Sequence, residues 1–514
     1  MEKIIQKIWQ DILNIRDVGI NDNFFALGGD SIRAIQIVTK LKSSGFNVKV
    51  QDIYQYQTVI EMAKILNRRE NINVNLTAAK VRDNEAERSL PFKLYAVSSM
   101  QEQIIRQYQN QQRGSGVYHY QQLIKITTRS FCEESFISAL YCIVQFNPIF
   151  RTVFVKNDNN EWQQYVKKNM DFVVGKYNFF GDKLAEKNYI SKLFISDRKN
   201  QFVAPNEIPL FRFNIIKINN INHFFMSIHH AIIDGWSNVE FFNQLTDSYN
   251  KIKENQIPRA TNNRDDLYKE FVELEHVVAS SMSAKKFWQS QINDMRYFTL
   301  KEKFIGAQLG VNSITKSLLL PKSTVDRMTK LSQLLNVSLK AILLSVYADL
   351  LSNLHQVNYI ATGVVTNGRN EQLSEPFKTI GLFWSLMPFS HEIISNKKLQ
   401  IESIQEQLNQ MEIYANYPIN NIMDTNTDKP IFSSTFNYVN FHNYSQNKHN
   451  NLDFDVIKYH DRYNSFLNTA LILNSQTNVI KIEITADTNC FDSDRLDNML
   501  TSYKEFLHDY IRGY

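Results

Sequence analysis

His229-His230-Ala231-Ile232-Ile233-Asp234-Gly235-Trp236-Ser237 stands between two different periodicities in this chain. Before it, Phe224, Met226 and Ile228 recur with a period of two, which predicts a largely buried strand. After it, Ser237-Asn238-Val239-Glu240 has the S-x-x-E form of a capping box, which predicts a helix that starts at Ser237. Two imidazoles and a carboxylate therefore lie on a short turn between a strand and a helix, where functional sites are often built.

The composition is that of a globular protein with more than one domain. A chain of 514 residues is too long for one ordinary core, so two or three domains are expected. Hydrophobic residues make up 43% and charged residues 21%, which are ordinary proportions for a soluble globular protein. The net charge of +5 is small for this length, so neither a nucleic acid nor a membrane surface is expected as a partner.

Cysteine usage and the lack of targeting signals predict a cytoplasmic protein. Cys132, Cys142 and Cys490 cannot form a disulfide framework and have no metal-ligand spacing, which favours a reducing compartment. The N-terminus is charged and amphipathic, unlike a signal peptide. The most apolar long segment, residues 341–354, contains Asp349 and is too short to span a bilayer.

Residues 1 to about 68 are expected to form a small bundle of four helices. A first helix with an apolar face is followed by a polar loop. A second helix runs from Ser31, and Gly45 suits its C-terminal cap. A short helix near residues 53–54 and a final one over 58–66 complete a bundle that is marginal in size but can fold alone. The apolar faces of the first two helices are formed by Ile4, Ile5, Ile8, Trp9 and Ile12, and by Ile32, Ile35, Val38 and Leu41.

Ser31 can be interpreted in two ways. An isolated serine at this position is most often a helix N-cap or a first-turn residue. The segment 23–32, N-F-F-A-L-G-G-D-S-I, however, closely resembles the attachment motif of the peptidyl or acyl carrier proteins of non-ribosomal peptide synthetases. The resemblance implies that a phosphopantetheinyl transferase esterifies Ser31 with 4′-phosphopantetheine, with Gly29 and Asp30 beside the attachment point. A helix N-terminus favours a phosphodiester, and the glycines would let the modifying enzyme approach closely.

The rest of the chain divides into a linker and a large two-part domain. Residues 71–90 are polar and charge-mixed, which indicates a linker after the carrier unit, 1–70. Beyond it, strand-type runs separated by long helices are typical of an α/β domain in two halves, 91–265 and 266–514. Such a domain is expected to have its ligand site between the halves.

Motifs in the large domain resemble, in order, those of the condensation domain of non-ribosomal peptide synthetases. Residues 229–235 match the pattern HHxxxDG in full. The resemblance implies two lobes, each similar to chloramphenicol acetyltransferase, in a V-shaped pseudo-dimer, so that the whole chain is α+β and multidomain. The other motifs are Ser98-Ser99-Met100-Gln101-Glu102, Asn147-Pro148-Ile149-Phe150-Arg151-Thr152-Val153-Phe154 (with Asn147 where histidine is usual), Asn367-Gly368-Arg369, Ile380-Gly381-Leu382-Phe383 and Phe436-Asn437-Tyr438-Val439-Asn440.

The resemblance assigns the chemistry of the turn to His230. A lone histidine is more often structural than catalytic, but the second position of HHxxxDG is the catalytic one in this family. His229 is expected to be a structural support satisfied by hydrogen bonds at the strand end. Gly235 is expected to keep the floor of the substrate channel open, because a side chain there would meet the substrate.

Asp234 has two candidate partners. A carboxylate four residues after His230 could orient the imidazole, but the family pattern pairs it with an arginine of the second lobe. Arg369 is the first candidate and Arg151 the alternative. Such a pair would be largely structural, and loss of one partner of a buried pair costs about 3–5 kcal/mol.

Metal binding and serine hydrolysis fit the sequence less well. His230 and Asp234 could be metal ligands on a helix, but the expected turn and the lack of a third ligand cluster argue against this, so no metal is expected. A serine hydrolase of the common type needs a G-x-S-x-G elbow, which the sequence lacks.

The order of the two units implies a direction for the reaction. In this family a carrier that precedes a condensation domain is on the donor side, so an acyl or peptidyl thioester at Ser31 would be attacked by an acceptor amine at His230 to give an amide. The amine would be free or held on another carrier, upstream adenylation and condensation domains would be partners, and a monomer is expected. A positioned base contributes about 10²–10⁴-fold, so loss of His230 should cripple the reaction without abolishing it.

Three other functions remain. An epimerisation domain shares the fold, and carriers before such domains often have Asp before the serine, as Asp30 is here. Its E-G-H-G-R segment aligns with residues 365–369, however, where Val365 replaces the acid/base glutamate.

A non-catalytic docking platform is disfavoured by the complete HHxxxDG motif. The third is a product-releasing condensation: after an expected helix over 493–511 the sequence has no second carrier or adenylation domain, which fits either a terminal domain or a piece of a longer synthetase.

Overall fold

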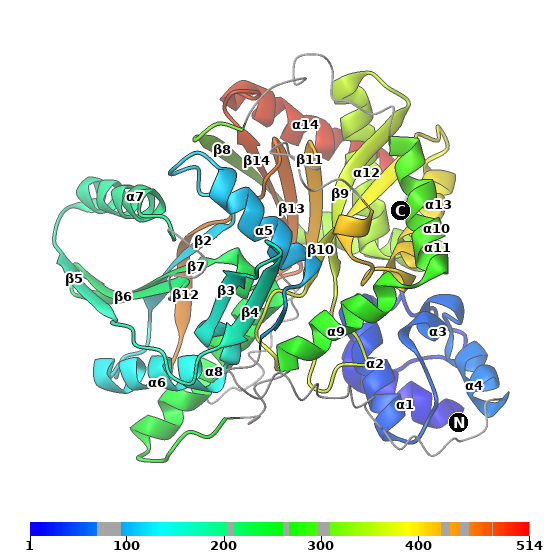
Figure 1. Cartoon of the computed structure of the whole chain (residues 1–514). Coiled ribbons are helices and arrows are strands. Elements are labelled where there is room, and N and C mark those ends of the chain that lie inside the picture. The colour runs from blue at the N-terminus through cyan, green and yellow to red at the C-terminus, as the bar shows by residue number, and fades with distance from the viewer. Residues whose placement is uncertain are drawn as a thin grey trace.

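Figure 1 shows a computed structural model of the chain, in which a small helical unit lies against one lobe of a larger two-lobed domain. The structure describes residues 1–68, 94–202, 209–260, 267–295, 309–422, 432–440, 452–474 and 476–512. The expected linker, 71–90, lies outside the described residues.

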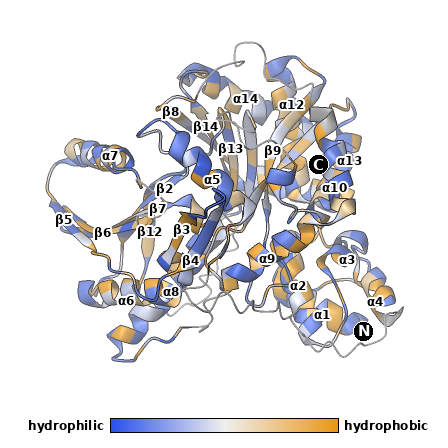
Figure 2. Cartoon of the chain, viewed as in Figure 1, coloured by the Kyte–Doolittle hydropathy of each residue, from blue (hydrophilic) through white to orange (hydrophobic). Residues whose placement is uncertain are grey.

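The N-terminal unit is a bundle of helices around a small aromatic core. The rings of Trp9 and Phe24 pack edge to face with their centroids 5.4 Å apart. Gly29 is required by this packing, because a Cβ there would lie 2.5 Å from the ring of Phe24. Figure 2 shows the helices of this bundle with both hydrophobic and hydrophilic residues, as amphipathic helices around a core should have. The helices are α1 (Glu2–Leu13), α2 (Ser31–Ser43), α3 (Val50–Gln55) and α4 (Val59–Arg68).

Helix α2 begins at Ser31, one residue after its N-cap. The carboxylate of Asp30 accepts a hydrogen bond from the backbone N–H of Arg33 at 2.9 Å, so the aspartate caps the helix. Gly45 follows the helix end with a φ of +88°, a conformation that glycine adopts without strain. Ser31 is therefore the first helical residue and lies at the positive end of the helix dipole.

The first lobe of the large domain is built on a five-stranded sheet with the order β12-β2-β7-β6-β5. Helices α6 and α8 cover one face and α7 covers the other (Figure 1), so the central strand β7 is buried on both sides. The elements are β2 (His119–Ile126), α6 (Glu133–Phe146), β5 (Gly175–Phe179), α7 (Lys183–Lys199), β6 (Phe211–Ile218), β7 (Ile221–His229), α8 (Gly235–Lys253) and β12 (Phe454–His460).

Strand β12 lies in the first lobe although it belongs to the second half of the sequence. It pairs antiparallel with β2, and His460 stands opposite Gln121. The division at residue 265 placed this segment in the second lobe, because polarity patterns do not reveal which sheet a strand joins. The chain crosses back to the second lobe directly after β12, so the residues that follow the strand lie where the two lobes meet.

A small antiparallel sheet and helix α5 flank the first lobe. Ser98 and Gln101 form a capping box at the start of α5, so this motif has a local structural role. The elements are β1 (Tyr95–Ala96), α5 (Ser99–Asn110), the 3₁₀ helix η2 (Pro148–Arg151), β3 (Thr152–Lys156) and β4 (Trp162–Val166).

The second lobe contains a six-stranded sheet with the order β10-β9-β11-β13-β14-β8. Helix α12 is buried along nearly its whole length and is capped by Ser338, as its apolar sequence predicts. The helices are α9 (Leu267–Ala279), α10 (Met282–Met295), α11 (Lys322–Leu335), α12 (Leu339–His355), α13 (Lys397–Ile413) and α14 (Ser493–Tyr510). The strands are β8 (Ser313–Leu320), β9 (Tyr359–Asn367), β10 (Trp384–Glu392), β11 (Ser434–Val439), β13 (Leu467–Asn474) and β14 (Val479–Asp487), and a 3₁₀ helix, η5, spans Ile419–Asn421.

Within the described ranges, no single helix combines the length and apolarity needed to cross a membrane; α11 and α12, which are bent by 106° at the break between them, meet those criteria only as a pair.

Candidate active site

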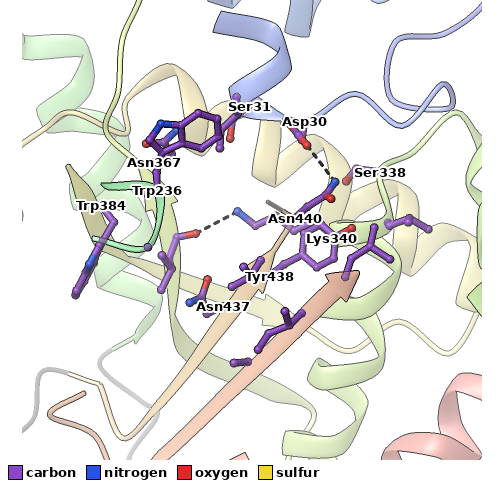
Figure 3. A pocket seen from close by; sticks show the side chains of 18 of the residues that line it. Asp30, Ser31, Trp236, Ser338, Lys340, Asn367, Trp384, Asn437, Tyr438 and Asn440 are labelled. Atoms are coloured by element: carbon purple, nitrogen blue, oxygen red, sulfur yellow. Dashed lines mark hydrogen bonds between the residues drawn. The ribbon is translucent and has the colours of Figure 1, made fainter. Parts of the chain in front are cut away.

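A cavity of about 1150 Å³ is lined by residues of the helical bundle and of both lobes. Residues 28–33 line it from the bundle, and His230 and residues 233–236 line it from the first lobe. Ser31 and His230 therefore face the same cavity, although their positions in the sequence differ by 199. Figure 3 shows Asp30, the N-cap of α2, beside the second-lobe side chain of Asn440, and Ser31 near Trp236 and Asn367.

Polar contacts between described residues hold the bundle against the second lobe. Asn440 Nδ2 donates to Asp30 Oδ2 at 3.2 Å, as the dashed line in Figure 3 marks. The backbone N–H of Val50 lies 3.5 Å from Glu371 Oε1, and Lys42 Nζ lies 4.0 Å from the same oxygen. These contacts place the N-terminus of α2 at the cavity.

The turn after β7 is capped by Asp234. Helix α8 begins at Gly235, and Asp234 Oδ1 accepts a hydrogen bond from the backbone N–H of Ser237 at 2.7 Å. The predicted capping box at Ser237 is therefore wrong. An aspartate caps a helix as well as a serine does, and the Ser237 hydroxyl instead donates to the carbonyl oxygen of Gly381 at 2.7 Å and accepts from its N–H at 3.0 Å. The hydroxyl thus joins the first lobe to the second.

Asp234 and Arg369 form a buried, two-point ion pair between the lobes. Arg369 Nη1 lies 2.6 Å from Asp234 Oδ2, and Nη2 lies 3.2 Å from Oδ1. The guanidinium also donates to Ser237 Oγ at 2.8 Å and stacks 4.2 Å from the ring centroid of Phe383. The backbone N–H of Phe383 completes the network at 3.0 Å from Asp234 Oδ2. This closed network is a scaffold that fixes the turn.

Arg151 takes no such position. Its guanidinium donates to the carbonyl oxygens of Lys167 and Lys168, the latter at 3.2 Å. Asp234 thus pairs with Arg369, as first expected, and the alternative pairing with Arg151 is wrong. Asn147, which stands where histidine is usual, donates to the carbonyl oxygen of Ile143 at 2.9 Å and to Gln244 Oε1 at 2.8 Å.

His229 is a neutral structural residue in this arrangement. Its Nδ1 accepts a hydrogen bond from the backbone N–H of Ala231 at 3.1 Å, and its ring packs 4.3 Å from that of Tyr108. Burial, with the nearby His119 and His230, lowers the pKa of His229 to about 3. A neutral imidazole is what a buried hydrogen-bond acceptor requires.

His230 lies on the 3₁₀ turn η3 (His230–Ile232) and bonds through both ring nitrogens. Nδ1 is 2.9 Å from the carbonyl oxygen of Ile233, and Nε2 is 3.0 Å from Asp461 Oδ1. Burial alone would lower the pKa of His230, but the charge and hydrogen bond of Asp461, the carbonyl of Ile233 and the charge of Asp234 together raise it above its ordinary value. His230 therefore holds its proton more strongly than an ordinary histidine does.

Asp461 is held by anchored residues on both sides. His460 Nε2 lies 3.1 Å from the carbonyl oxygen of Gly116. Arg462 forms a buried ion pair with Asp487 at 2.7 Å and donates to the carbonyl oxygen of Ser115 at 3.1 Å. Because β12 and this ion pair fix the chain before and after it, Asp461 is positioned by both lobes.

The other site residues support the turn or open onto the cavity. Gln101 Nε2 donates to the carbonyl oxygen of Ala231 at 3.0 Å, so the capping residue of α5 also braces the turn. Gly235 is exposed and lines the cavity. Val365 lines it too, and its carbonyl oxygen accepts from Lys340 Nζ at 3.2 Å.

The cavity offers polar groups that suit a pantetheine chain with its phosphate. Lys340 Nζ lies 3.8 Å from Glu412 Oε1, and burial lowers the pKa of the lysine. Asn367 Nδ2 and Trp384 Nε1 line the cavity and are buried N–H donors without an acceptor in the described structure. Unpaired buried donors are costly, so they fit a ligand with amide carbonyl groups. The described residues contain no group of three or more His, Cys, Asp or Glu that could hold a metal ion.

The structure thus combines a carrier-type helical bundle with a two-lobed domain. The N-terminus of helix α2 in the bundle and the second histidine of HHxxxDG line the same cavity. Residues 93–513 match the condensation domain family, and residues 3–66 match the phosphopantetheine attachment site family. Because the first match spans more than half of the chain, the chain belongs to the condensation domain family. The second match shows that a carrier domain precedes it and takes 4′-phosphopantetheine on a serine.

Known relatives extend these matches. Bacitracin synthase 1 of Bacillus licheniformis is 23% identical over 408 residues, which are 76% of this chain and 7% of that protein. Gramicidin S synthase 1 of Brevibacillus brevis is 23% identical over 422 residues, 79% of this chain and 36% of that protein. The nonribosomal peptide synthetase ungA of Aspergillus violaceofuscus is 27% identical over 241 residues, 46% of this chain and 2% of that protein. The chain thus spans only a small part of the length of these curated relatives.

Solved structures share the two-lobed fold. The first condensation domain of the calcium-dependent antibiotic synthetase, in complex with a substrate analogue, has a TM-score of 0.67 at 13% identity over 82% of this chain and 97% of that one. The epimerization domain from the third module of tyrocidine synthetase B has a TM-score of 0.66 at 15% identity over 82% and 96%. The fold is therefore common to both reaction types and does not choose between them.

Sequence reasoning missed Asp461, together with the aromatic residues around it. Asp461 follows an ordinary strand, belongs to none of the recognised motifs and lies 231 residues from His230. The available signal was a carboxylate directly before Arg462 in a short polar stretch, which is too common a pattern to single out.

Proposed function

We propose that this chain forms an amide bond between an acyl or peptidyl group carried at Ser31 and an acceptor amine that binds beside His230. The observation that carries the proposal is the single cavity lined by both residues. The relatives support the substrate class, since one of them is named a nonribosomal peptide synthetase.

Ser31 is the proposed attachment residue because it is the first residue of a helix and lines the cavity. When bound there, 4′-phosphopantetheine supplies the thiol that holds the acyl donor as a thioester. Lys340 would hold its phosphate, and Asn367 and Trp384 would donate hydrogen bonds to its amide groups. Asp30 caps the helix, and Gly29 packs on the bundle core.

His230 is the proposed proton-transfer residue. Its Nε2 points to Asp461 in the cavity, whereas Nδ1 is committed to the carbonyl oxygen of Ile233. A neutral Nε2 can take a proton from the attacking amine nitrogen, which contributes about 10²–10⁴-fold. Holding both substrates in one cavity contributes up to about 7–11 kcal/mol more. His229, Asp234, Gly235 and Arg369 keep the turn and the channel in shape.

The proposed partners follow from this reaction. A phosphopantetheinyl transferase would modify Ser31, and upstream adenylation and condensation domains would supply the donor. The acceptor amine would be free or held on another carrier. Epimerisation is the second candidate, because a solved epimerization domain has this fold and Asp30 precedes Ser31. It is disfavoured because Val365, which lines the cavity, cannot move a proton.

One experiment tests both candidates. Ser31 is loaded with an acyl-pantetheine, free amines and aminoacyl carriers are offered in turn, and products are identified by mass spectrometry in D₂O. The proposal predicts an amide and no α-deuterium in the recovered donor, and the Ser31→Ala variant should give neither. Exchange at the α-carbon without amide would instead show an epimerase. The acceptor that reacts tells whether the product is released or passed to another carrier.

A further inference from the structure

His230 and Asp461 form a cation–carboxylate pair inside the cavity. Both ring nitrogens of His230 face oxygen atoms, Ile233 O at 2.9 Å and Asp461 Oδ1 at 3.0 Å. An imidazole donates from both nitrogens only as the imidazolium. While Nε2 is engaged with Asp461 in this way, it is not available as a base.

Aromatic rings surround this pair. The ring centroids of Tyr120, Trp384 and Tyr463 lie 5.9, 6.1 and 6.1 Å from that of His230, and those of Trp384 and Tyr463 are 5.3 Å apart. All of these residues, together with Asp461, line the cavity. A carboxylate among aromatic rings is the chemistry by which proteins recognise organic ammonium ions.

We propose that Asp461 and the rings of Tyr120, Trp384 and Tyr463 form the binding site for the acceptor amine, which enters as its ammonium ion and competes with His230 for the carboxylate. The identity of the ammonium ion as a substrate rests on the proposed amide-forming function. The site itself rests on the distances and the shared cavity.

This competition moves two protons, one from His230 to solvent and then one from the ammonium ion to His230. When R–NH₃⁺ takes the place of the imidazolium at Asp461, His230 gives its Nε2 proton to solvent and becomes neutral. Its free Nε2 can then take a proton from the ammonium nitrogen, which leaves R–NH₂ as the nucleophile and restores the imidazolium beside Asp461. The acceptor thus generates the base that activates it.

The other charged groups around the pair cannot play this part. Asp234 is paired with Arg369, and Arg462 is paired with Asp487. His229 is neutral, since its pKa is about 3. Glu483, at the edge of the site, pairs with Lys481 and accepts from the hydroxyl of Tyr459 at 2.7 Å. Burial and the charge of Asp461 raise the pKa of the nearby tyrosines, which are therefore neutral at pH 7: Tyr118, Tyr120, Tyr459 and Tyr463.

Binding can be measured on the full chain without its prosthetic group. The probe is glycinamide at pH 6.5, where an α-amine with a pKa near 8 is almost fully protonated. Calorimetry in two buffers of different ionisation enthalpy counts the protons released, and N-acetylglycinamide is the uncharged control. We expect glycinamide to bind with release of up to one proton, and the acetylated probe to bind at least tenfold more weakly.

Three variants separate the site from a structural effect. Asp461→Asn should weaken glycinamide binding at least tenfold, whereas Asp455→Asn, which changes an exposed carboxylate on the preceding strand β12, should leave it unchanged. His230→Gln should keep or improve binding but release no proton, because the competing cation is gone. If His230 had only a structural role, the His230→Gln variant would not lose proton release while it still binds glycinamide.

Failure of the inference and failure of the proposed function give different results. No binding of glycinamide to the natural chain, or equal binding to Asp461→Asn, would overturn the ammonium site even if the loaded chain makes amides. Ammonium binding through Asp461 with no amide from the loaded chain would instead overturn the proposed function. If Asp461→Asn does not fold, proton release by the natural chain and its loss in His230→Gln still decide the question.

Discussion

Two ion pairs reach the same turn and differ in almost every physical respect. The side chains of Arg369 and Asp234 are 1% and 3% exposed and are joined by two hydrogen bonds. Those of His230 and Asp461 are 5% and 28% exposed and share one contact, which opens onto the cavity. The difference teaches that the closed pair maintains the turn, whereas the open pair is available to a substrate.

Breaking the closed pair should have the largest effect on stability. Asp234→Ala leaves the guanidinium of Arg369 buried without its carboxylate and removes the N-cap of α8. Loss of one partner of a buried pair costs about 3–5 kcal/mol. Urea denaturation of the natural chain and the variant measures this change, and Asp455→Ala is the control for an exposed aspartate. A loss below about 0.5 kcal/mol, the range of ordinary surface substitutions, would contradict the scaffold role.

Breaking the open pair should affect the reaction more than the fold. A partly exposed ion pair contributes about 0–1 kcal/mol, so Asp461→Asn should unfold at nearly the same urea concentration as the natural chain. We expect the KM for a free amine to rise about tenfold, which corresponds to about 1.4 kcal/mol of lost binding. Steady-state rates at several amine concentrations measure it. An unchanged KM together with a large loss of stability would reverse the roles of the two pairs.

The raised pKa of His230 gives the open pair a pH signature. A group whose pKa is higher in the folded than in the unfolded chain stabilises the fold below about pH 6.5, its unfolded value, and this contribution is lost as pH rises through the folded value. The difference in unfolding free energy between the natural chain and His230→Gln should therefore shrink between pH 6 and pH 9. Parallel denaturation curves at both pH values check this, and a growing difference would mean that Asp461 does not hold an imidazolium.

Glu275 differs from both ion pairs because it is a buried carboxylate that accepts a hydrogen bond from a backbone N–H. Its expected effect on stability is the smallest of the three. Ser99 donates to it at 2.9 Å, and burial raises its pKa to about 8. A raised carboxyl pKa means that stability falls as pH rises from the unfolded value near 4.3 toward 8. Glu275→Gln keeps an acceptor without the charge, so it should stabilise the chain more at pH 8 than at pH 5. Thermal unfolding at both pH values measures this, and an equal shift would contradict a buried charge.

Much of the architecture could be predicted because local patterns determine it. The alternation before His229 is a property of a single element, and the segment has the predicted form of a largely buried strand. The capping box at Ser237 was wrong for a physical reason. Two good caps stood three residues apart, and the partner that decided between them, Gly381, lies 144 residues away.

The site was harder to predict where it depends on long-range pairing. The order of the motifs predicted site roles for His230, Asp234 and Arg369, and the structure places all three where the two lobes meet. Asp461 was missed because β12 crosses to the first lobe, and nothing in its polarity pattern shows that β2 is its neighbour. Long-range strand pairing is set by the whole fold, so residues that follow a crossover strand are the ones that sequence patterns reveal least.

The most direct test of the central claim is a single-turnover measurement on chain loaded at Ser31 with an acyl-pantetheine. The rate of amide formation with a saturating free amine is compared between the natural chain and a folded His230→Ala variant. We predict an amide from the natural chain and a rate about 10²–10⁴-fold lower in the variant. Equal rates in the two chains would contradict the assignment of His230, and with it the proposal that the shared cavity is the place of reaction.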